Sequence, residues 1–435
     1  MTNVLLNKAN TINSISSVIE SIVAPAIMLL MVPVFLNILG SESFAVWILV
    51  NSFVASLMAL SFGGGNTIIK YISDQRYKDN FLFSSIFIFQ LLILLILSVI
   101  FFSISLILEE FFVNSLFAYT NYIIAIFVIK QLESLNYAFC KGKERYDISS
   151  ILSSSAKLVF LGTQLIALIY TNDLNLVFEY AIIAALFLYL IQIIILKNIY
   201  SDFKLFHSFK ITNIKLVLSY SIWNWYLSLV GIIFSNFDKW LVGIVMGFEV
   251  LGYYAVAVLF FNQTYMIINS LVAWFFPMVS RKGMTSEIVY LYNALTKGIA
   301  FLTILASLFL INFNQLFIFW LGTDNYILSS QSIYLFICLL PAFSLRIIPH
   351  FMLLARGQVR KKFFYDAIAL FVRGIIGIFI LNSYGINVLI TGFLIDMVIT
   401  IILYNYSFYK HLDNLSKIVI AITLLFSIVN LYYYI

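Results

Sequence analysis

Six basic residues lie within long apolar stretches of this 435-residue sequence rather than in its loops. A charged side chain at the centre of a bilayer costs roughly 2.5–3.5 kcal/mol, so such residues usually face a protein interior or a water-filled cavity. They are Lys130, Lys157, Lys239, Lys297, Arg346 and Arg373. Arg346 follows Lys130 by 216 residues, and Arg373 follows Lys157 by the same 216 residues. This shared displacement predicts two matching basic pairs in two related halves of the chain.

Basic side chains in a site of low dielectric attract anions strongly, and a guanidinium group suits the oxygens of a phosphate in bidentate geometry. We therefore expect these side chains to bind an anionic group of a substrate in a central cavity. The predicted substrate-binding residues are Lys130, Lys157, Arg346, Arg373 and Lys239. The alternative is ion pairing within the helix bundle, since Glu133 lies one turn from Lys130 and Asp238 adjoins Lys239.

Acidic residues also occur inside the apolar stretches. They are Glu20, Glu133, Asp238 and Asp396. A buried carboxyl group near cations can gain or lose a proton as its surroundings change. Glu20 and Asp238, on the first helix of each half, are the candidates for coupling to protons or sodium, and structural pairing is the alternative.

Proline removes a helix hydrogen bond and favours a kink. The predicted kink residues are Pro25, Pro33, Pro341 and Pro349. Because Pro341 and Pro349 lie on either side of Arg346, we expect that helix to bend where its charge points inward.

The composition is that of an integral membrane protein, with 63% apolar and 10% charged residues and a mean hydropathy of +1.03. A spanning helix needs about 20 apolar residues. The sequence predicts an all-α fold of about 12 transmembrane helices, near 12–38, 43–69, 81–108, 115–139, 148–170, 175–197, 213–246, 250–280, 288–311, 328–355, 363–381 and 385–408.

Short motifs recur in the two halves. "LGSESFAVW" at 39–47 returns as "MGFEVLGYY" at 246–254, and "CKGKER" at 140–145 returns as "ARGQVR" at 355–360. Six helices per half give both halves the same orientation, an arrangement of transporters that work by alternating access. The first motif predicts a tight outer turn, whose Glu42 and Glu249 are either solvated carboxylates or part of an outer gate.

The predicted domains follow from this repeat. They are an N-terminal six-helix bundle at 1–200, a cytoplasmic linker at 201–212, a C-terminal six-helix bundle at 213–410 and a C-terminal apolar segment at 411–435. The run 418–435 either spans the membrane as a thirteenth helix or lies against it.

Several classes of site lack support. Cys140 and Cys338 are isolated, as are the three histidines, so neither a disulfide framework nor a metal site is expected. We expect no catalytic residues and no cofactor. The net charge of +6 requires no nucleic-acid partner, because loop basic residues on one side of the membrane account for it.

The sequence resembles the polysaccharide-transport family of the multidrug/oligosaccharidyl-lipid/polysaccharide (MOP) exporter superfamily, and specifically the Wzx-type O-antigen flippases of Gram-negative inner membranes. The resemblance covers nearly the whole chain. It rests on "SVIESIVAPAIMLLMVPVFLNILGSESFAVW" at the first helix, "FDKWLVGIVMGFEVLGYYAVA" at 237–257, "KGKER" at 141–145 and "RGQVRKK" at 356–362.

This resemblance implies a MATE-like fold and an ion-coupled transporter rather than an enzyme. Its cargo would be an undecaprenyl-pyrophosphate-linked oligosaccharide, moved from the cytoplasmic to the periplasmic leaflet for lipopolysaccharide biosynthesis. Implied partners are the lipid bilayer and polysaccharide assembly proteins, namely a polymerase and a chain-length regulator. Two alternatives stay open: a cation-coupled multidrug exporter, whose cavity we would expect to be acidic, and a membrane-embedded O-antigen polymerase, which we would expect to have larger outer loops.

The basic residues also predict the topology. Nineteen of the 25 fall in loops that share one side, and the expected outer connections at 40–43, 109–114, 171–175, 247–250, 312–327 and 382–384 contain none. By the positive-inside rule the N-terminus is expected to be cytoplasmic.

Single cysteines placed in 140–147 and 355–362 should resist a membrane-impermeant thiol reagent in intact cells. Rapid labelling from outside would reverse this orientation.

Overall fold

The computed structural model describes residues 2–60, 79–111, 117–200, 203–206, 236–272, 274–384 and 386–434, with a few isolated positions between them. Within helices, the side chains of 2–24, 79–81, 108–111, 117, 277, 280–282, 359, 377–384, 386–391 and 434 are not described. Two compact units are present: residues 1–27 with 46–233, and residues 28–45 with 234–435. The predicted seventh span, 213–246, falls largely outside the described residues.

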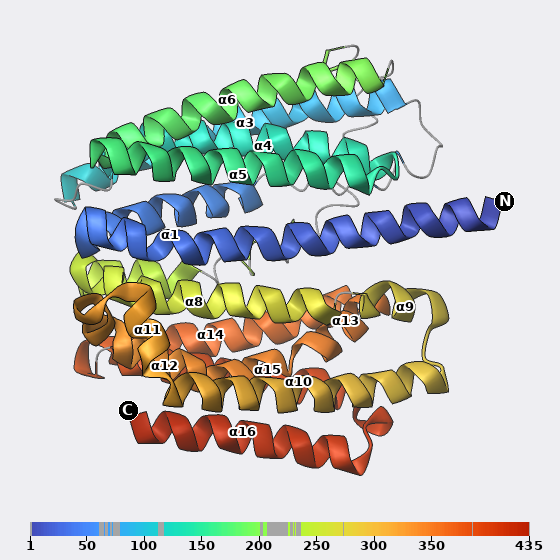
Figure 1. Ribbon diagram of the computed structural model, residues 1–435, viewed down its shortest axis with the longest axis vertical. Helices are drawn as coiled ribbons and strands as arrows, with labels where there is room; N and C mark the ends of the chain where they lie inside the picture. Colours follow the sequence, from blue (N-terminus) through green and yellow to red (C-terminus); the bar gives the residue numbers. More distant parts are fainter. Residues whose placement is uncertain are drawn as a thin grey trace. The chain divides into compact units, whose positions relative to one another are not determined.

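The described part of the first unit contains four long helices besides its share of α1, which Figure 1 labels. They are α3 (Asp79–Phe111), α4 (Thr120–Gly142), α5 (Tyr146–Thr171) and α6 (Leu174–Ile199), with a short 3-10 turn at Phe117–Tyr119. Its core is aromatic: the Phe139 ring contacts Phe83 and Phe203, each at 5.1 Å between centroids. The buried Trp47 indole donates a hydrogen bond of 3.0 Å to Gln164 on α5, which satisfies its polar atom in an apolar interior.

Helix α1 (Thr2–Leu60) covers the first predicted span and the second as far as Leu60, and it is interrupted at Gly40. Gly40 has φ 74° and Gly247, just before α8, has φ 89°, a region that glycine enters without steric cost. The two repeated motifs therefore form turns of the same kind, and their Glu42 and Glu249 side chains are exposed. A Cβ on Gly252 would lie 2.2 Å from the Ser41 carbonyl oxygen, so this glycine lets the two motifs touch.

Nine α-helices with described bounds lie in the second unit, besides residues 28–45 of α1. They are α8 (Phe248–Val272), α9 (Phe275–Lys282), α10 (Ser286–Asn312), α11 (Asn314–Leu321), α12 (Thr323–Ser344), α13 (Ile347–Ala355), α14 (Val359–Tyr384) and α15 (Ile386–Tyr406), followed by α16 (Asn414–Tyr434) after a 3-10 turn at Tyr409–His411. Helix α8 packs on α12, and α14 packs on α15. The stretch 312–327, expected to be an outer connection, is instead mostly helical.

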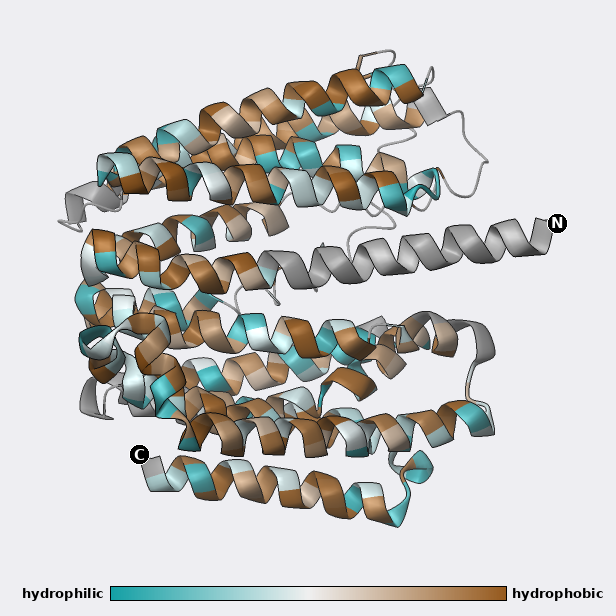
Figure 2. Cartoon of the chain, viewed as in Figure 1, coloured by the Kyte–Doolittle hydropathy of each residue, from teal (hydrophilic) through white to brown (hydrophobic). Residues whose placement is uncertain are grey.

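The C-terminal apolar run forms α16, which packs on α10 and α12. Residues Asn414–Tyr433 are long and apolar enough to cross a membrane. Among the described residues, nine helices meet this criterion. Figure 2 shows hydrophobic residues along most of their length. The predicted all-α membrane fold is confirmed.

The predicted bend near Arg346 is present as a break between α12 and α13. Pro349 lies in the first turn of α13, where its missing N–H is harmless, but within one continuous helix its ring would clash with the Leu345 carbonyl. Helix α1, by contrast, continues through Pro25 and Pro33, and its non-helical residue is Gly40.

Two prolines inside helices leave a carbonyl oxygen without its usual donor, because each lacks an N–H for the residue four positions earlier. Pro341 leaves the Ile337 carbonyl, which accepts a hydrogen bond of 3.0 Å from the Ser307 hydroxyl on α10. Pro33 leaves the Leu29 carbonyl, which accepts one of 2.8 Å from the Trp320 indole on α11. Both donors come from neighbouring helices of the second unit, so each proline marks a tertiary contact.

We expect Ser307→Ala to lower the free energy of unfolding by about 1–3 kcal/mol, because a buried carbonyl would lose its donor. The midpoint of thermal unfolding of the purified protein in detergent measures this loss. The control is Ser330→Ala, since the exposed Ser330 hydroxyl bonds only within its own helix, to the Ile327 carbonyl. Equal midpoints for the two variants would contradict a role for Ser307 in supporting α12.

Candidate functional site

A buried ion pair joins two of the predicted site residues. The Arg373 Nη2 atom on α14 lies 3.2 Å from the Asp238 Oδ1 atom, and the two side chains are 3% and 1% exposed. The Tyr254 hydroxyl on α8 donates a hydrogen bond of 2.8 Å to the other Asp238 oxygen. The Arg373 guanidinium also stacks on the Phe393 ring of α15, with 3.3 Å from its central carbon to the ring centroid. The sequence placed Arg373 and Asp238 in separate roles, and the structure brings them together.

Arg346 occupies the break between α12 and α13, where the helix path turns. Its guanidinium carbon lies 3.6 Å from the Phe343 ring centroid and 5.9 Å from that of Tyr265. Such cation–π contacts hold a guanidinium group in place without using its hydrogen-bond donors on a carboxylate. The charges of Arg346 and Arg373 both act on Asp396 of α15. Both predicted arginines thus act electrostatically on one carboxyl group, and neither donates a hydrogen bond to it.

Lys239 contributes to the same region of the second unit. Its Nζ atom donates a hydrogen bond of 2.8 Å to the Asn236 side chain, while its neighbour Asp238 is engaged by Arg373. Lys239 is within electrostatic range of both Asp238 and Arg373. The ion pair that sequence proximity suggested, between Asp238 and Lys239, is therefore replaced by one between helices.

In the first unit, Lys130 and Lys157 are close enough for their charges to interact. The Lys130 Nζ atom lies 4.0 Å from the centroid of the Phe160 ring on α5. Glu133, one turn away, accepts a hydrogen bond of 3.4 Å from Gln192 on α6. Lys157 is exposed on the surface of its unit. The two predicted lysines are thus brought together, with a buried carboxyl group beside them.

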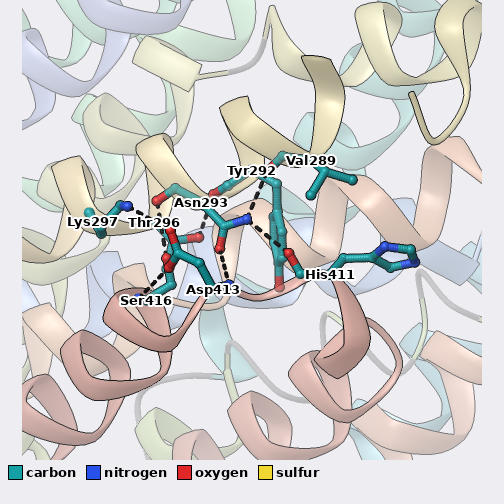
Figure 3. A network of polar contacts seen from close by, with 8 residues as sticks. All are labelled: Val289, Tyr292, Asn293, Thr296, Lys297, His411, Asp413 and Ser416. Atoms are coloured by element: carbon teal, nitrogen blue, oxygen red, sulfur yellow. Dashed lines mark hydrogen bonds and ion pairs between the residues drawn. The ribbon is translucent and has the colours of Figure 1, made fainter. Parts of the chain in front are cut away.

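Lys297 has a different setting from the other intramembrane basic residues. Its Nζ atom lies 2.9 Å from Asp413, which precedes α16. Figure 3 shows this ion pair beside Asn293, whose side-chain amide donates to the His411 carbonyl and accepts from the Asp413 amide. Hydrogen bonds from Ser416 and then from Lys297 lower the pKa of Asp413 to about 2. This network attaches α16 to α10 and gives Lys297 a structural partner.

The remaining predictions have mixed outcomes. Glu20 lies in α1, but its side chain is outside the described residues. Asp396 received no role from the sequence beyond its position in an apolar stretch, and the aromatic partners Phe393 and Tyr254 carried no distinguishing signal at all. Among the described residues, no three His, Cys, Asp or Glu side chains gather as a metal ion would require.

The arrangement suits the binding of anions. Guanidinium and ammonium groups near an aromatic surface can exchange an internal carboxylate for the oxygens of an external phosphate.

The family model that describes polysaccharide biosynthesis proteins matches residues 10–282, more than half of the chain. The chain belongs to this family.

Solved structures show that this family member has the fold of the MOP exporters. The lipid II flippase MurJ in an inward closed conformation has a TM-score of 0.69 and 14% identity, covering 97% of each chain. A eukaryotic MATE transporter has a TM-score of 0.65 and 13% identity, covering 97% of this chain and 99% of its own. A MOP superfamily transporter from Pyrococcus furiosus has a TM-score of 0.59 and 12% identity, covering 96% of both.

The curated proteins compared with this sequence include no match. The three structural relatives are flippases or transporters by name rather than enzymes. The chain is a multi-pass membrane protein, as its long apolar helices indicate, and it shares the fold of these structures.

The buried pair of this family member makes a coupled prediction. Removing one partner of a buried ion pair costs about 3–5 kcal/mol, because the other charge stays buried without compensation. We expect Arg373→Met and Asp238→Asn each to lower the thermal unfolding midpoint in detergent. The double variant should be more stable than either single variant. Losses that simply add would show that the two side chains are energetically independent.

Proposed function

We propose that this protein is a flippase that moves undecaprenyl-pyrophosphate-linked repeat units of an O-antigen, or of a related surface polysaccharide, across the inner membrane. Movement is from the cytoplasmic to the periplasmic leaflet by alternating access, coupled to an ion. The N-terminus lies in the cytoplasm. A polymerase and a chain-length regulator then act on the delivered units.

Family membership and fold support the general class of this function. The matching family is named for polysaccharide biosynthesis, and MurJ, which shares the fold, is named as a flippase of lipid II. Both names connect a membrane-embedded chain of this type to saccharides attached to lipids. The step from lipid-linked saccharides in general to an O-antigen repeat unit is part of the proposal.

The observation that carries the proposal is the set of basic groups inside the apolar helices of both units. In the second unit, the charges of Arg346 and Arg373 both act on Asp396. In the first unit, the charges of Lys130 and Lys157 act on each other. Aromatic rings contact three of these four cations, which holds them in place while leaving charge available for an anion. A pyrophosphate with attached sugars is a fitting cargo for such groups.

The two alternatives fit less well. A multidrug exporter of organic cations would be expected to have a predominantly acidic cavity, whereas the apolar stretches of this chain hold six basic residues against four acidic ones. A polymerase would be expected to have a substantial outer loop region. The longest expected outer connection, 312–327, instead folds into α11 and the start of α12.

Deletion of the gene is the direct test. We expect lipid-linked repeat units to accumulate on the cytoplasmic face and surface polysaccharide to disappear. If single repeat units instead reached the periplasmic face and only chain extension failed, the protein would be a polymerase. If polysaccharide were unchanged and sensitivity to cationic drugs increased, the multidrug alternative would replace the flippase.

Complementation of the deletion strain tests the residues. Arg346→Ala should abolish export at near-normal protein levels, and Arg346→Lys should retain part of it because the charge remains without the bidentate fork. Arg373→Ala should also abolish export, at a protein level lowered by the loss of its ion pair with Asp238. Asp324→Asn is a control, since Asp324 is an exposed residue in the first turn of α12. Normal export by both alanine variants would remove the arginines from the proposed binding site.

A further inference from the structure

Asp396, in the part of the second unit that the structure describes, combines full burial with a carboxyl group that lacks hydrogen-bond donors. It lies on α15 with 0% of its surface exposed. Among the residues that the structure describes, neither of its carboxyl oxygens has a hydrogen-bond partner. Asp238, another buried carboxyl group of the second unit, differs in this respect, since it accepts a hydrogen bond from the Tyr254 hydroxyl.

The charged groups that act on Asp396 come from two directions. They are Arg346 at the α12–α13 break, and Arg373 and Asp366 on α14. Each is engaged elsewhere in this conformation: Arg373 with Asp238 and the Phe393 ring, Arg346 with the Phe343 ring, and Asp366 with Lys362 and the Tyr404 hydroxyl. No guanidinium group donates a hydrogen bond to Asp396.

An ionised carboxylate buried without donors is far more costly than a neutral carboxylic acid in the same place. The arrangement therefore suits a protonated Asp396 while both arginines are held by other partners. If either guanidinium turned toward Asp396, it would supply the donors and the opposite charge that an ionised carboxylate needs. Asp396 is thus protonated while both arginines are held elsewhere, and ionised when one of them pairs with it.

We propose that Asp396 is a proton-binding site linked to the binding of a phosphate-bearing anion by Arg346 and Arg373. When the anion occupies the arginines, Asp396 holds a proton. When the anion leaves, an arginine pairs with Asp396. The O–H bond of the Asp396 carboxyl group then breaks, and the proton passes to water. This inference rests on the proposed function for the identity of the anion, and it names a coupling residue other than Glu20 or Asp238.

Linkage between two ligands is reciprocal, so each must strengthen the binding of the other. With inorganic pyrophosphate as the probe, the affinity of the purified full-length protein should rise as pH falls. For one linked proton the limit is about tenfold per pH unit. Pyrophosphate itself also titrates, but equally for every variant, so the Asp396-dependent part is the difference between the wild type and Asp396→Asn.

Infrared spectroscopy of the protein in detergent detects the proton directly. The carbonyl stretch of a protonated carboxyl group should be present in the wild type, increase on addition of pyrophosphate, and be absent in Asp396→Asn. It should persist in Asp324→Asn. Asp396→Glu should shift the band rather than remove it, which keeps the test decisive if the asparagine variant does not fold.

The outcomes separate the two proposals. A band that is unchanged in Asp396→Asn overturns the proton site. A band that depends on Asp396 but does not respond to pyrophosphate, with no pyrophosphate bound, overturns the linkage and counts against the proposed anion site. If the deletion strain accumulated no lipid-linked repeat units and kept its surface polysaccharide, the flippase function would be rejected. The Asp396 band would still be evidence of a proton site.

Discussion

Inside a bilayer no water satisfies polar groups, so every carbonyl, amide and charge of a spanning helix needs a partner from the protein. The second unit shows this constraint at two prolines. Pro341 and Pro33 each leave a carbonyl without its helical donor, and Ser307 and Trp320 replace it from adjacent helices. The prolines that weaken single helices therefore create the contacts that bind helices to one another. The Trp320 contact also helps to hold residues 28–45 of α1 within the second unit.

The same constraint shapes the charges. Arg373 cannot remain alone at 2% exposure, and Asp238 and Phe393 surround its guanidinium with opposite charge and an aromatic face. Within the described residues, one Asp238 oxygen and both carboxyl oxygens of Asp396 have no hydrogen-bond partner. The ion pair with Arg373 compensates the charge of Asp238, whereas an ionised carboxylate at Asp396 would be buried without donors.

The duplication sets positions but not environments. Lys130 and Arg346 correspond in sequence, yet Lys130 lies over a ring of the next helix while Arg346 sits where its own helix breaks. Gly40 and Gly247 correspond as well, and both keep a positive φ, of 74° and 89°. A turn depends on local backbone geometry and survives duplication unchanged, whereas a buried charge depends on neighbours that diverge between the halves.

The sequence by itself determined the membrane class, most of the helices, the bend near Arg346 and the positions of the intramembrane charges, because apolar length, proline and charge act locally along the chain. It could not predict which charges pair. Asp238 adjoins Lys239 in sequence but binds Arg373, and Lys297 binds Asp413 beyond the next helices. Partner choice depends on which helix faces meet, and the free energy of a buried charge is set by all the groups around it. Only the tertiary structure decided those contacts, and with them the isolation of Asp396.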